Sequence, residues 1–199
     1  MYQGNPRFCR MKKFYGFTLL ELMVVMAIIA ILATLAAPSF TRLIQTNTMS
    51  SNVNTFLADM RYARSESTRR GGGVVMCRSD DPEASNPRCV DDSVPGGNGW
   101  VSGWIIFQDW NNDGIQNAVE PLLRVQSPIT SMDSITEGDG TTSTRFRFTA
   151  TGRLSTATTP VMLKFGGSNY ASDIKRIVCV GLGGRARIAS PGAVDCAGQ

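Results

Sequence analysis

The chain has 199 residues, with 20 lysines and arginines, 16 aspartates and glutamates, and no histidine. The lack of histidine excludes Ser-His and Cys-His nucleophile pairs. The sequence also contains no glycine-rich phosphate loop ending in Lys-Ser or Lys-Thr. We therefore expect a protein that is not an enzyme.

An apolar run with a single charge follows the N-terminus. It extends from Phe17 to Ala37, directly after Lys12, Lys13 and three further residues, and Glu21 is its one charged residue. A helix of this length can cross a hydrocarbon core of about 30 Å. A lone carboxylate in such a helix costs roughly 2.5 to 3.5 kcal/mol near the membrane centre, so Glu21 needs a partner.

This pattern resembles the class III signal of type IV pilins and type II secretion pseudopilins: a basic leader, a glycine, Phe-Thr-Leu, an acid, and an uninterrupted apolar helix. The resemblance implies that a prepilin peptidase cuts between Gly16 and Phe17 and methylates Phe17. It also implies that Glu21 sets subunit register during assembly. The amine of Phe17 on one subunit and Glu21 on its neighbour can pair and neutralise the buried charge. An ordinary signal anchor is the alternative, and it leaves Glu21 unexplained.

The resemblance divides the chain into four segments: a cleaved leader (1–16), a transmembrane and assembly helix (17–37), an amphipathic continuation (38–70) and a β-rich head (71–199). A leader of the family's usual length would start at Met11. The basic leader places the N-terminus in the cytoplasm. We therefore expect a single pass through the inner membrane of a Gram-negative bacterium, with the head in the periplasm, and later incorporation into a pilus or pseudopilus. Pro38 is expected to kink the helix.

The segment from Thr41 to Arg70 has the pattern of an amphipathic helix. Its apolar residues recur at spacings of three and four: Val53, Phe56, Leu57, Met60 and Ala63. We expect this stripe to pack on a sheet and the glycines at 71–73 to end the helix.

Short strands separated by Gly, Pro, Asn and Ser clusters follow the helix. The expected strands are Val74–Cys77, Trp100–Gln108, Leu122–Gln126, Thr144–Thr149, Val161–Phe165 and Lys175–Val180. The polar residues 79–99 are expected to form an exposed loop. The fold class is α+β, a type IV pilin-like lollipop in which the long N-terminal helix packs on a C-terminal antiparallel β-sheet head.

Finer features resemble the GspH/FimT group of minor pilins and pseudopilins. They include Arg61–Glu66 near the helix end, Gly103–Phe107 in a strand, and Gly184–Arg187 near the C-terminus. The resemblance implies a minor pilin that assembles with other pilins and primes or caps a type IV pilus. The alternative is a GspH-like minor pseudopilin of a type II protein secretion system.

Four cysteines lie beyond the leader, Cys77, Cys89, Cys179 and Cys196, and an exported domain is expected to oxidise them. They allow three pairings. We favour Cys77 with Cys89 and Cys179 with Cys196, because each closes a short local loop. A zinc site is the competing interpretation, but the chain has neither a C-x-x-C pair nor a histidine.

One segment matches a calcium-loop spacing, D-x-N-x-D-G-x5-E. The candidate ligands are Asp109, Asn111, Asp113, Ile115, Asn117 and Glu120. The segment lies between two expected strands and lacks the flanking helices of an EF-hand. The competing prediction is a hairpin connection in which Asn, Asp and Gly serve turn geometry.

Charge is distributed unevenly along the chain. Removal of the leader takes four bases with it, which leaves 16 bases and 16 acids. Within this balance, residues 79–120 carry eight acids and one base, whereas residues 141–199 carry eight bases and two acids. Such asymmetry indicates a basic binding face or simply a solvated surface.

The basic C-terminal part contains a Gly-Arg-x-Arg element at Gly184, Arg185 and Arg187. In an extended segment the two arginines share one face. In the FimT branch such an element is associated with DNA capture for natural transformation, and Lys175 and Arg176 would extend the patch. Contact with double-stranded DNA, without sequence specificity, is therefore one hypothesis; arginines that face solvent or another subunit are the alternative.

Overall fold

The structure, a computed structural model, describes residues 16–90, 99–138, 144–155, 157, 159–190 and 192–196. The expected leader therefore lies, apart from Gly16, outside the described residues. The chain divides into two compact units, Met1–Arg42 and Leu43–Gln199, and we call the second unit the head. The helix α1 (Leu19–Arg70) contributes residues to both units.

In the first unit, α1 is an apolar helix. By length and composition, no single helix of the described residues qualifies as a membrane span, although Leu19–Thr34 and Ser39–Arg70 qualify together as a bent pair. The side chains of residues 35–38 are not described, so the kink at Pro38 stays a prediction.

The end of α1 is set by glycines, as the sequence predicts. Gly71 has a φ of 80°, a left-handed conformation that side chains disfavour. The N–H of Gly72 then donates to the carbonyl of Ser67 at 2.7 Å, the hydrogen bond of a Schellman motif. The chain turns back at this point and enters the first strand.

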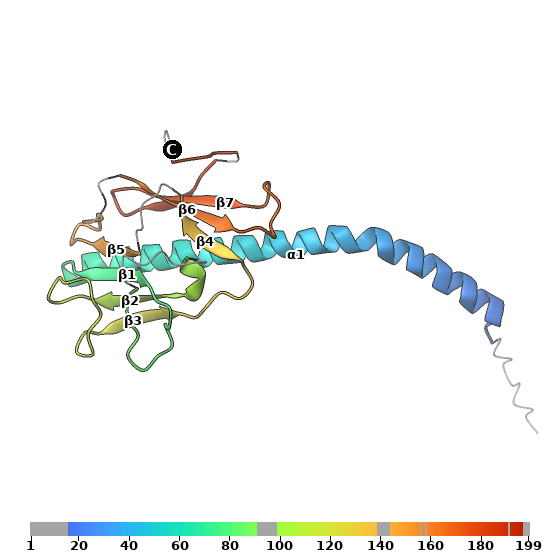
Figure 1. Ribbon diagram of the computed structural model, residues 1–199, viewed down its shortest axis with the longest axis horizontal. Helices are drawn as coiled ribbons and strands as arrows, with labels where there is room; N and C mark the ends of the chain where they lie inside the picture. The colour runs from blue at the N-terminus through green and yellow to red at the C-terminus, as the bar shows by residue number, and fades with distance from the viewer. Residues whose placement is uncertain are drawn as a thin grey trace, which may run out of the picture. The chain divides into compact units, whose positions relative to one another are not determined.

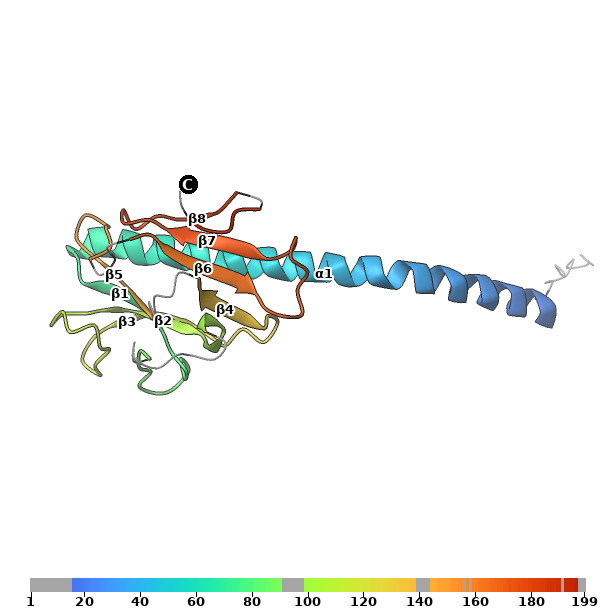
Figure 2. The ribbon, with the colours of Figure 1, turned by 45° about the horizontal axis from the view of Figure 1, so that its top comes forward.

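The head contains two antiparallel four-stranded sheets (Figures 1 and 2). Sheet A has the order β3-β2-β1-β5 and sheet B the order β4-β6-β7-β8. The strands of sheet A are β1 (Val74–Arg78), β2 (Trp104–Gln108), β3 (Leu122–Gln126) and β5 (Arg145–Phe148). The strands of sheet B are β4 (Ser134–Glu137), β6 (Val161–Gly166), β7 (Arg176–Val180) and β8 (Ala186–Ile188).

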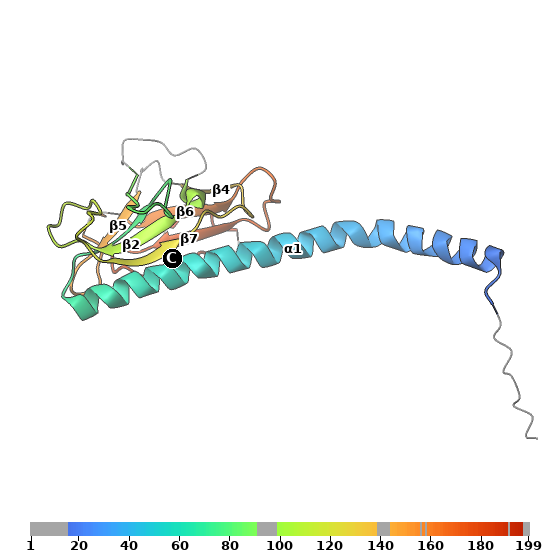
Figure 3. The ribbon, with the colours of Figure 1, turned by 90° about the horizontal axis from the view of Figure 1, so that it is seen from below.

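The predicted apolar stripe of α1 packs in the core of the head, and Figure 3 shows α1 running along one side of the sheets. All five predicted residues are buried, and Met49 extends the stripe by one turn. Phe56 contacts four aromatic rings edge-on, with centroids 5.4 to 6.3 Å apart: Trp100, Trp104, Phe146 and Phe165. Trp104 and Phe146 belong to sheet A and Phe165 to sheet B, so one helix joins the two sheets into a single core.

The outer face of sheet A is also covered. Val75, Cys77, Ile105 and Phe107 form a second buried cluster, on which Cys89 packs. The prediction that residues 79–99 form an exposed loop is therefore wrong for part of the described portion, since residues 79, 82, 87 and 90 are buried. This loop shields apolar side chains that β1 and β2 place on the outer face.

Both predicted disulfides are present. Cys77 bonds Cys89, and Cys179 bonds Cys196, with Cα atoms 5.5 and 5.7 Å apart. The first disulfide ties the 79–90 loop to β1. The second ties the C-terminal segment to the outer face of sheet B.

One strand prediction needs correction, and two strands were not predicted. The predicted strand Trp100–Gln108 is a 3₁₀ turn, η1 (Trp100–Ser102), followed by β2, because Gly103 breaks the extended run with a φ of 106°. The strands β4 and β8 are absent from the predicted set, because four and three residues are too few to give a clear apolar alternation.

Substitution of Phe56 by alanine is expected to destabilise the head by about 3 to 5 kcal/mol, since it removes a fully buried ring shared by both sheets. Guanidinium titration of the full chain in detergent, followed by tryptophan fluorescence, measures the change. Val119→Ala is the control, because Val119 is 76% exposed and its truncation should change stability by less than about 0.5 kcal/mol. Equal midpoints for the two variants would contradict the central role of Phe56.

Candidate functional site

The first turn of α1 is capped by Thr18. Its Oγ1 accepts the N–H of Glu21 at 3.2 Å, and its carbonyl accepts the N–H of Leu22 at 3.1 Å. Threonine followed by glutamate three residues later is the signature of a capping box, a signal that the sequence analysis overlooked. The capped turn places Glu21 at the positive end of the helix dipole.

Apolar surface surrounds this acid. Every described side chain from Phe17 to Thr34 is exposed, including Phe17 at 84%. A contiguous exposed apolar surface of this size marks contact with a membrane or a partner. A Cβ added at Gly16 would have no described atom within 4 Å, so the described chain leaves space beside this residue of the predicted cleavage position.

The Gly-Arg-x-Arg element forms the turn and second strand of the β7–β8 hairpin. Arg187 lies opposite Cys179, and Ala186 lies opposite Val180. Arg185 and Arg187 are exposed on one face, while Ala186 packs against the core, as the extended arrangement predicts. In the described part of the chain, neither arginine has an ion-pair partner.

Gly184 has a packing role. It is buried with a φ of 71°, and a Cβ at this position would lie 3.1 Å from the ring of Phe148 and would clash with the carbonyl of Gly152. The carbonyl of Gly152 in turn accepts the Nε–H of Arg64 at 3.1 Å. The glycine therefore docks the arginine-bearing turn against the end of α1.

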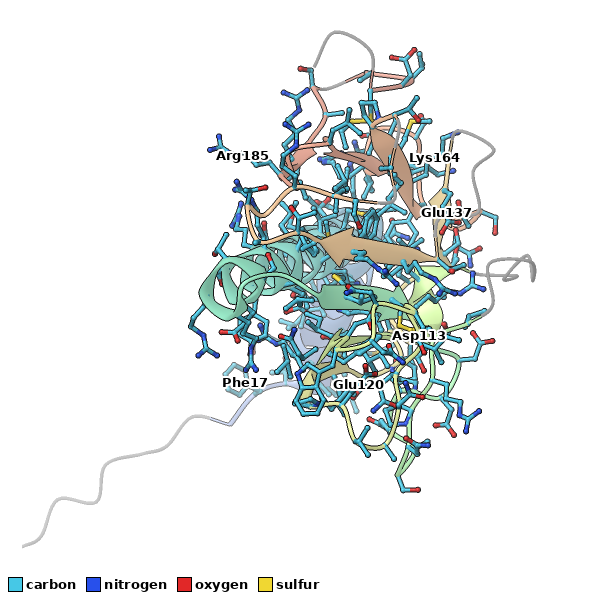
Figure 4. The ribbon with its side chains drawn as sticks, turned by 90° about the vertical axis from the view of Figure 1, so that its left-hand side faces the viewer. Phe17, Asp113, Glu120, Glu137, Lys164 and Arg185 are labelled. Atoms are coloured by element: carbon cyan, nitrogen blue, oxygen red, sulfur yellow. A yellow bond between two sulfur atoms is a disulfide. The ribbon has the colours of Figure 1, made fainter. Side chains whose placement is uncertain are left out.

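The other two predicted patch residues lie elsewhere. Lys175 and Arg176 are at the start of β7, about 13 Å of strand away from the turn that carries Arg185. The guanidinium of Arg176 donates to the backbone carbonyls of residues 173, 174 and 175 at 2.8 to 3.0 Å. These two residues and Lys164 line a groove of about 900 Å³ on the outer face of sheet B. Figure 4 shows Lys164 and Arg185 on different sides of this part of the head.

The predicted calcium segment is a closed loop between β2 and β3. Asp109 is buried; its Oδ2 accepts the N–H of Gly114 at 2.9 Å and pairs with Arg147 at 3.1 Å. Glu120 is also buried, and its two oxygens accept the N–H groups of Trp110 at 2.9 Å and Asn117 at 3.0 Å. These carboxylates hold the loop together through its own backbone and through a cation on β5.

The exposed tip of this loop consists of Asx turns. The Oδ1 of Asn111 accepts the N–H of Asp113, and the Oδ1 of Asp113 accepts the N–H of Ile115 at 2.7 Å. The hydrogen bond from Ile115 is the main cause that lowers the pKa of Asp113 below its ordinary value. Among the described residues, no three acidic, cysteine or histidine side chains converge on a common metal position. The geometry favours the turn prediction, and calcium binding stays an untested prediction.

A buried acid that the sequence analysis missed fixes α1 to sheet A. Asp59 accepts the indole N–H of Trp104 at 2.8 Å and pairs with Arg124 at 2.9 Å. The guanidinium of Arg124 also lies over the ring of Tyr62, 5.3 Å from its centroid. Burial raises the pKa of Asp59, while the hydrogen bond from Trp104 and the charge of Arg124 oppose that shift.

Comparisons with known proteins agree with this architecture. The family described as Type II transport protein GspH matches residues 52–184, and the Prokaryotic N-terminal methylation motif matches residues 11–37. Among solved structures, the type IV minor pilin FimU of Pseudomonas aeruginosa (strain PAO1) is similar, with a TM-score of 0.53 and 18% identity. This match covers 75% of the present chain and 96% of the FimU chain. No curated protein matches by sequence.

Calcium at millimolar concentration is expected to leave the thermal midpoint of the full chain unchanged, because the carboxylates of Asp109 and Glu120 are already engaged. A ligand that binds only the folded state must raise the midpoint. Melting curves with calcium, with chelator and with magnesium as a charge-matched control provide the measurement. A rise specific to calcium, abolished by Asp113→Ala, would assign the loop as a calcium site.

Proposed function

The chain belongs to the GspH/FimT family of type IV minor pilins and pseudopilins, and we propose that it is a minor type IV pilin held in its fibre by Glu21. The family consists of membrane-anchored subunits that assemble with other pilins. The observation that carries the proposal is the capped acid at the start of the apolar part of α1, whose described side chains from Leu19 to Thr34 are all exposed. Thr18 fixes the first turn, and Glu21 has apolar residues on every side.

Assembly removes the cost of the buried charge. Cleavage after Gly16 creates an amine on Phe17, one residue before the cap. In a bundle of such helices the amine of one subunit neutralises Glu21 of the next, and neither charge remains unpaired in hydrocarbon. The pair forms only at one axial offset between neighbours, so it also sets the register of the fibre.

The same proposal gives the partners and the location. The prepilin peptidase processes the chain in the inner membrane, the head stays in the periplasm, and the subunit then joins other pilins and primes or caps the pilus. The alternative is a minor pseudopilin of a type II secretion system, which would use the same helix. Recovery of the chain from fibres sheared off the cell surface supports the pilus; retention in the cell envelope together with a secretion defect supports the pseudopilus.

DNA capture is a second candidate function, and one specific observation favours it. Arg185 and Arg187 are exposed on the same face, without an acidic partner in the described residues, on a turn fixed by Gly184. Two guanidinium groups held in this way suit contacts with successive phosphates. Such contacts do not read bases, so the binding would be independent of sequence.

Glu21→Ala is expected to reduce recovery of the subunit in sheared fibres on the order of 50-fold, because the amine of its neighbour is left unpaired at a cost of roughly 2.5 kcal/mol. Immunoblots of sheared and cell-bound fractions measure the loss, and intact mass confirms that leader cleavage is unaffected. Thr34→Ala is the control, since the Thr34 hydroxyl donates to the carbonyl of Ile31 in its own helix. Equal incorporation of the Glu21 variant and the native chain would contradict the proposal.

Replacement of Arg185 and Arg187 together by alanine is expected to weaken binding of double-stranded DNA and to lower the slope of log affinity against log salt by roughly two. Gel-shift titrations of the full chain in detergent, over a range of salt concentrations, measure both quantities. Lys164→Ala with Lys175→Ala removes the same charge from the other end of sheet B and serves as the matched control. If both double variants bind equally, the arginine pair is not the DNA site.

A further inference from the structure

The groove on the outer face of sheet B has the features of an interaction surface. Its lining includes Ile177 and Ile188 together with Gly192 and Ala193 of the C-terminal segment. Lys164 and Lys175 line it, both exposed, and neither has an ion-pair partner within the described residues. Asp173 is the acid on its lining. Two ammonium groups beside apolar lining residues suit an acidic polypeptide segment.

A complementary segment lies on the opposite flank of the same head. Asp80, Asp81 and Glu83 are exposed at the start of the loop that covers sheet A, and the hydroxyl of Ser127 donates to Glu83. Figures 1 and 2 both place this loop and the C-terminal segment on opposite flanks of the head. A head therefore cannot place its own acidic segment in its own groove.

The two surfaces also lie toward the same end of the head. The connection between β6 and β7, on the rim of the groove, is held by Gln45, whose side chain donates to the carbonyl of Asn169 at 3.2 Å. The connection after β3, which holds Glu83 through Ser127, reaches Ser131 beside Asn52. Both contacts use the half of α1 nearer Leu43. The two surfaces thus lie at the same level along α1 and on opposite flanks of the head. Side-by-side packing of copies requires this arrangement of complementary surfaces.

We propose that this groove binds the acidic segment Asp80–Glu83 of a second copy of this chain, so that neighbouring heads contact each other side by side. The contact is heterologous: each head offers its groove on one flank and its acidic segment on the other. Attraction between the lysines and the acids guides the encounter, and burial of apolar lining residues by the bound segment slows dissociation. This inference rests on the proposed function, because assembly by the apolar helix brings heads to the required spacing.

Site-directed cross-linking in the producing bacterium tests the contact with the full chain. One tagged copy carries Asp81→Cys and a second, differently tagged copy carries Lys175→Cys. The native cysteines of the described chain are held in two disulfides and do not compete. Mild oxidation is expected to give a species that carries both tags at twice the subunit mass, reversed by reductant. Pairing Asp81→Cys with Arg185→Cys is the matched control, because Arg185 lies at the other end of sheet B, and this pair should give no such species.

Charge reversal provides the second measurement. Lys164→Glu with Lys175→Glu is expected to reduce the cross-link between Glu83→Cys and Ser190→Cys copies roughly tenfold, and Asp80→Lys with Asp81→Lys in the partner copy is expected to restore it. Absence of the doubly tagged species from the Asp81→Cys and Lys175→Cys copies, while the subunit is still recovered in sheared fibres, would overturn this inference and leave the proposed function standing. Absence of both this species and the subunit from sheared fibres would overturn the proposed function. A cross-link from Lys175→Cys to a different protein would show that the partner is not a second copy.

Discussion

The head depends on the packing of one aromatic residue of α1, Phe56, between two sheets. Its ring touches Trp104 and Phe146 of sheet A and Phe165 of sheet B. An antiparallel sheet of four short strands buries little apolar surface on its own, so each sheet of the head needs the helix as its second layer. The shared ring fixes the distance between the sheets, and their outer faces become the two flanks of the head.

Apolar packing alone leaves the rotation of a helix on a sheet weakly determined, and Asp59 supplies the missing restraint. Its carboxylate meets the indole of Trp104 on β2 and the guanidinium of Arg124 on β3. Loss of one partner would leave a buried charge uncompensated. The free-energy cost of such a charge is far larger than the stabilisation that an exposed ion pair provides. The cluster therefore holds α1 in one orientation, and the Arg64 contact with the 149–154 turn follows from that orientation.

The sequence could predict what depends on local spacing. The apolar stripe of α1, the glycine end of the helix and both disulfides follow from residues that are near each other in the chain. The Asp109–Arg147 pair and the separation of Lys175 from Arg185 depend on strand order, which single-sequence patterns do not encode. The position of Asp59 could nevertheless have been used for prediction. An acid three residues after Phe56, within an apolar stripe, indicates a buried partner.

The loop between β2 and β3 also explains why charge counted along the chain misrepresents the surface. Residues 79–120 hold eight acids and one base in the sequence, yet Asp109 and Glu120 are buried, and their charges serve backbone N–H groups and Arg147. The guanidinium supplies positive charge beside Asp109, the role that the calcium prediction gave to a metal. The exposed acids of the described part of this segment are then few: Asp80, Asp81, Glu83 and Asp113. Three of the four lie together on the flank opposite the lysine groove, so the folded head concentrates its charge asymmetry into two small surfaces that a neighbouring subunit can contact.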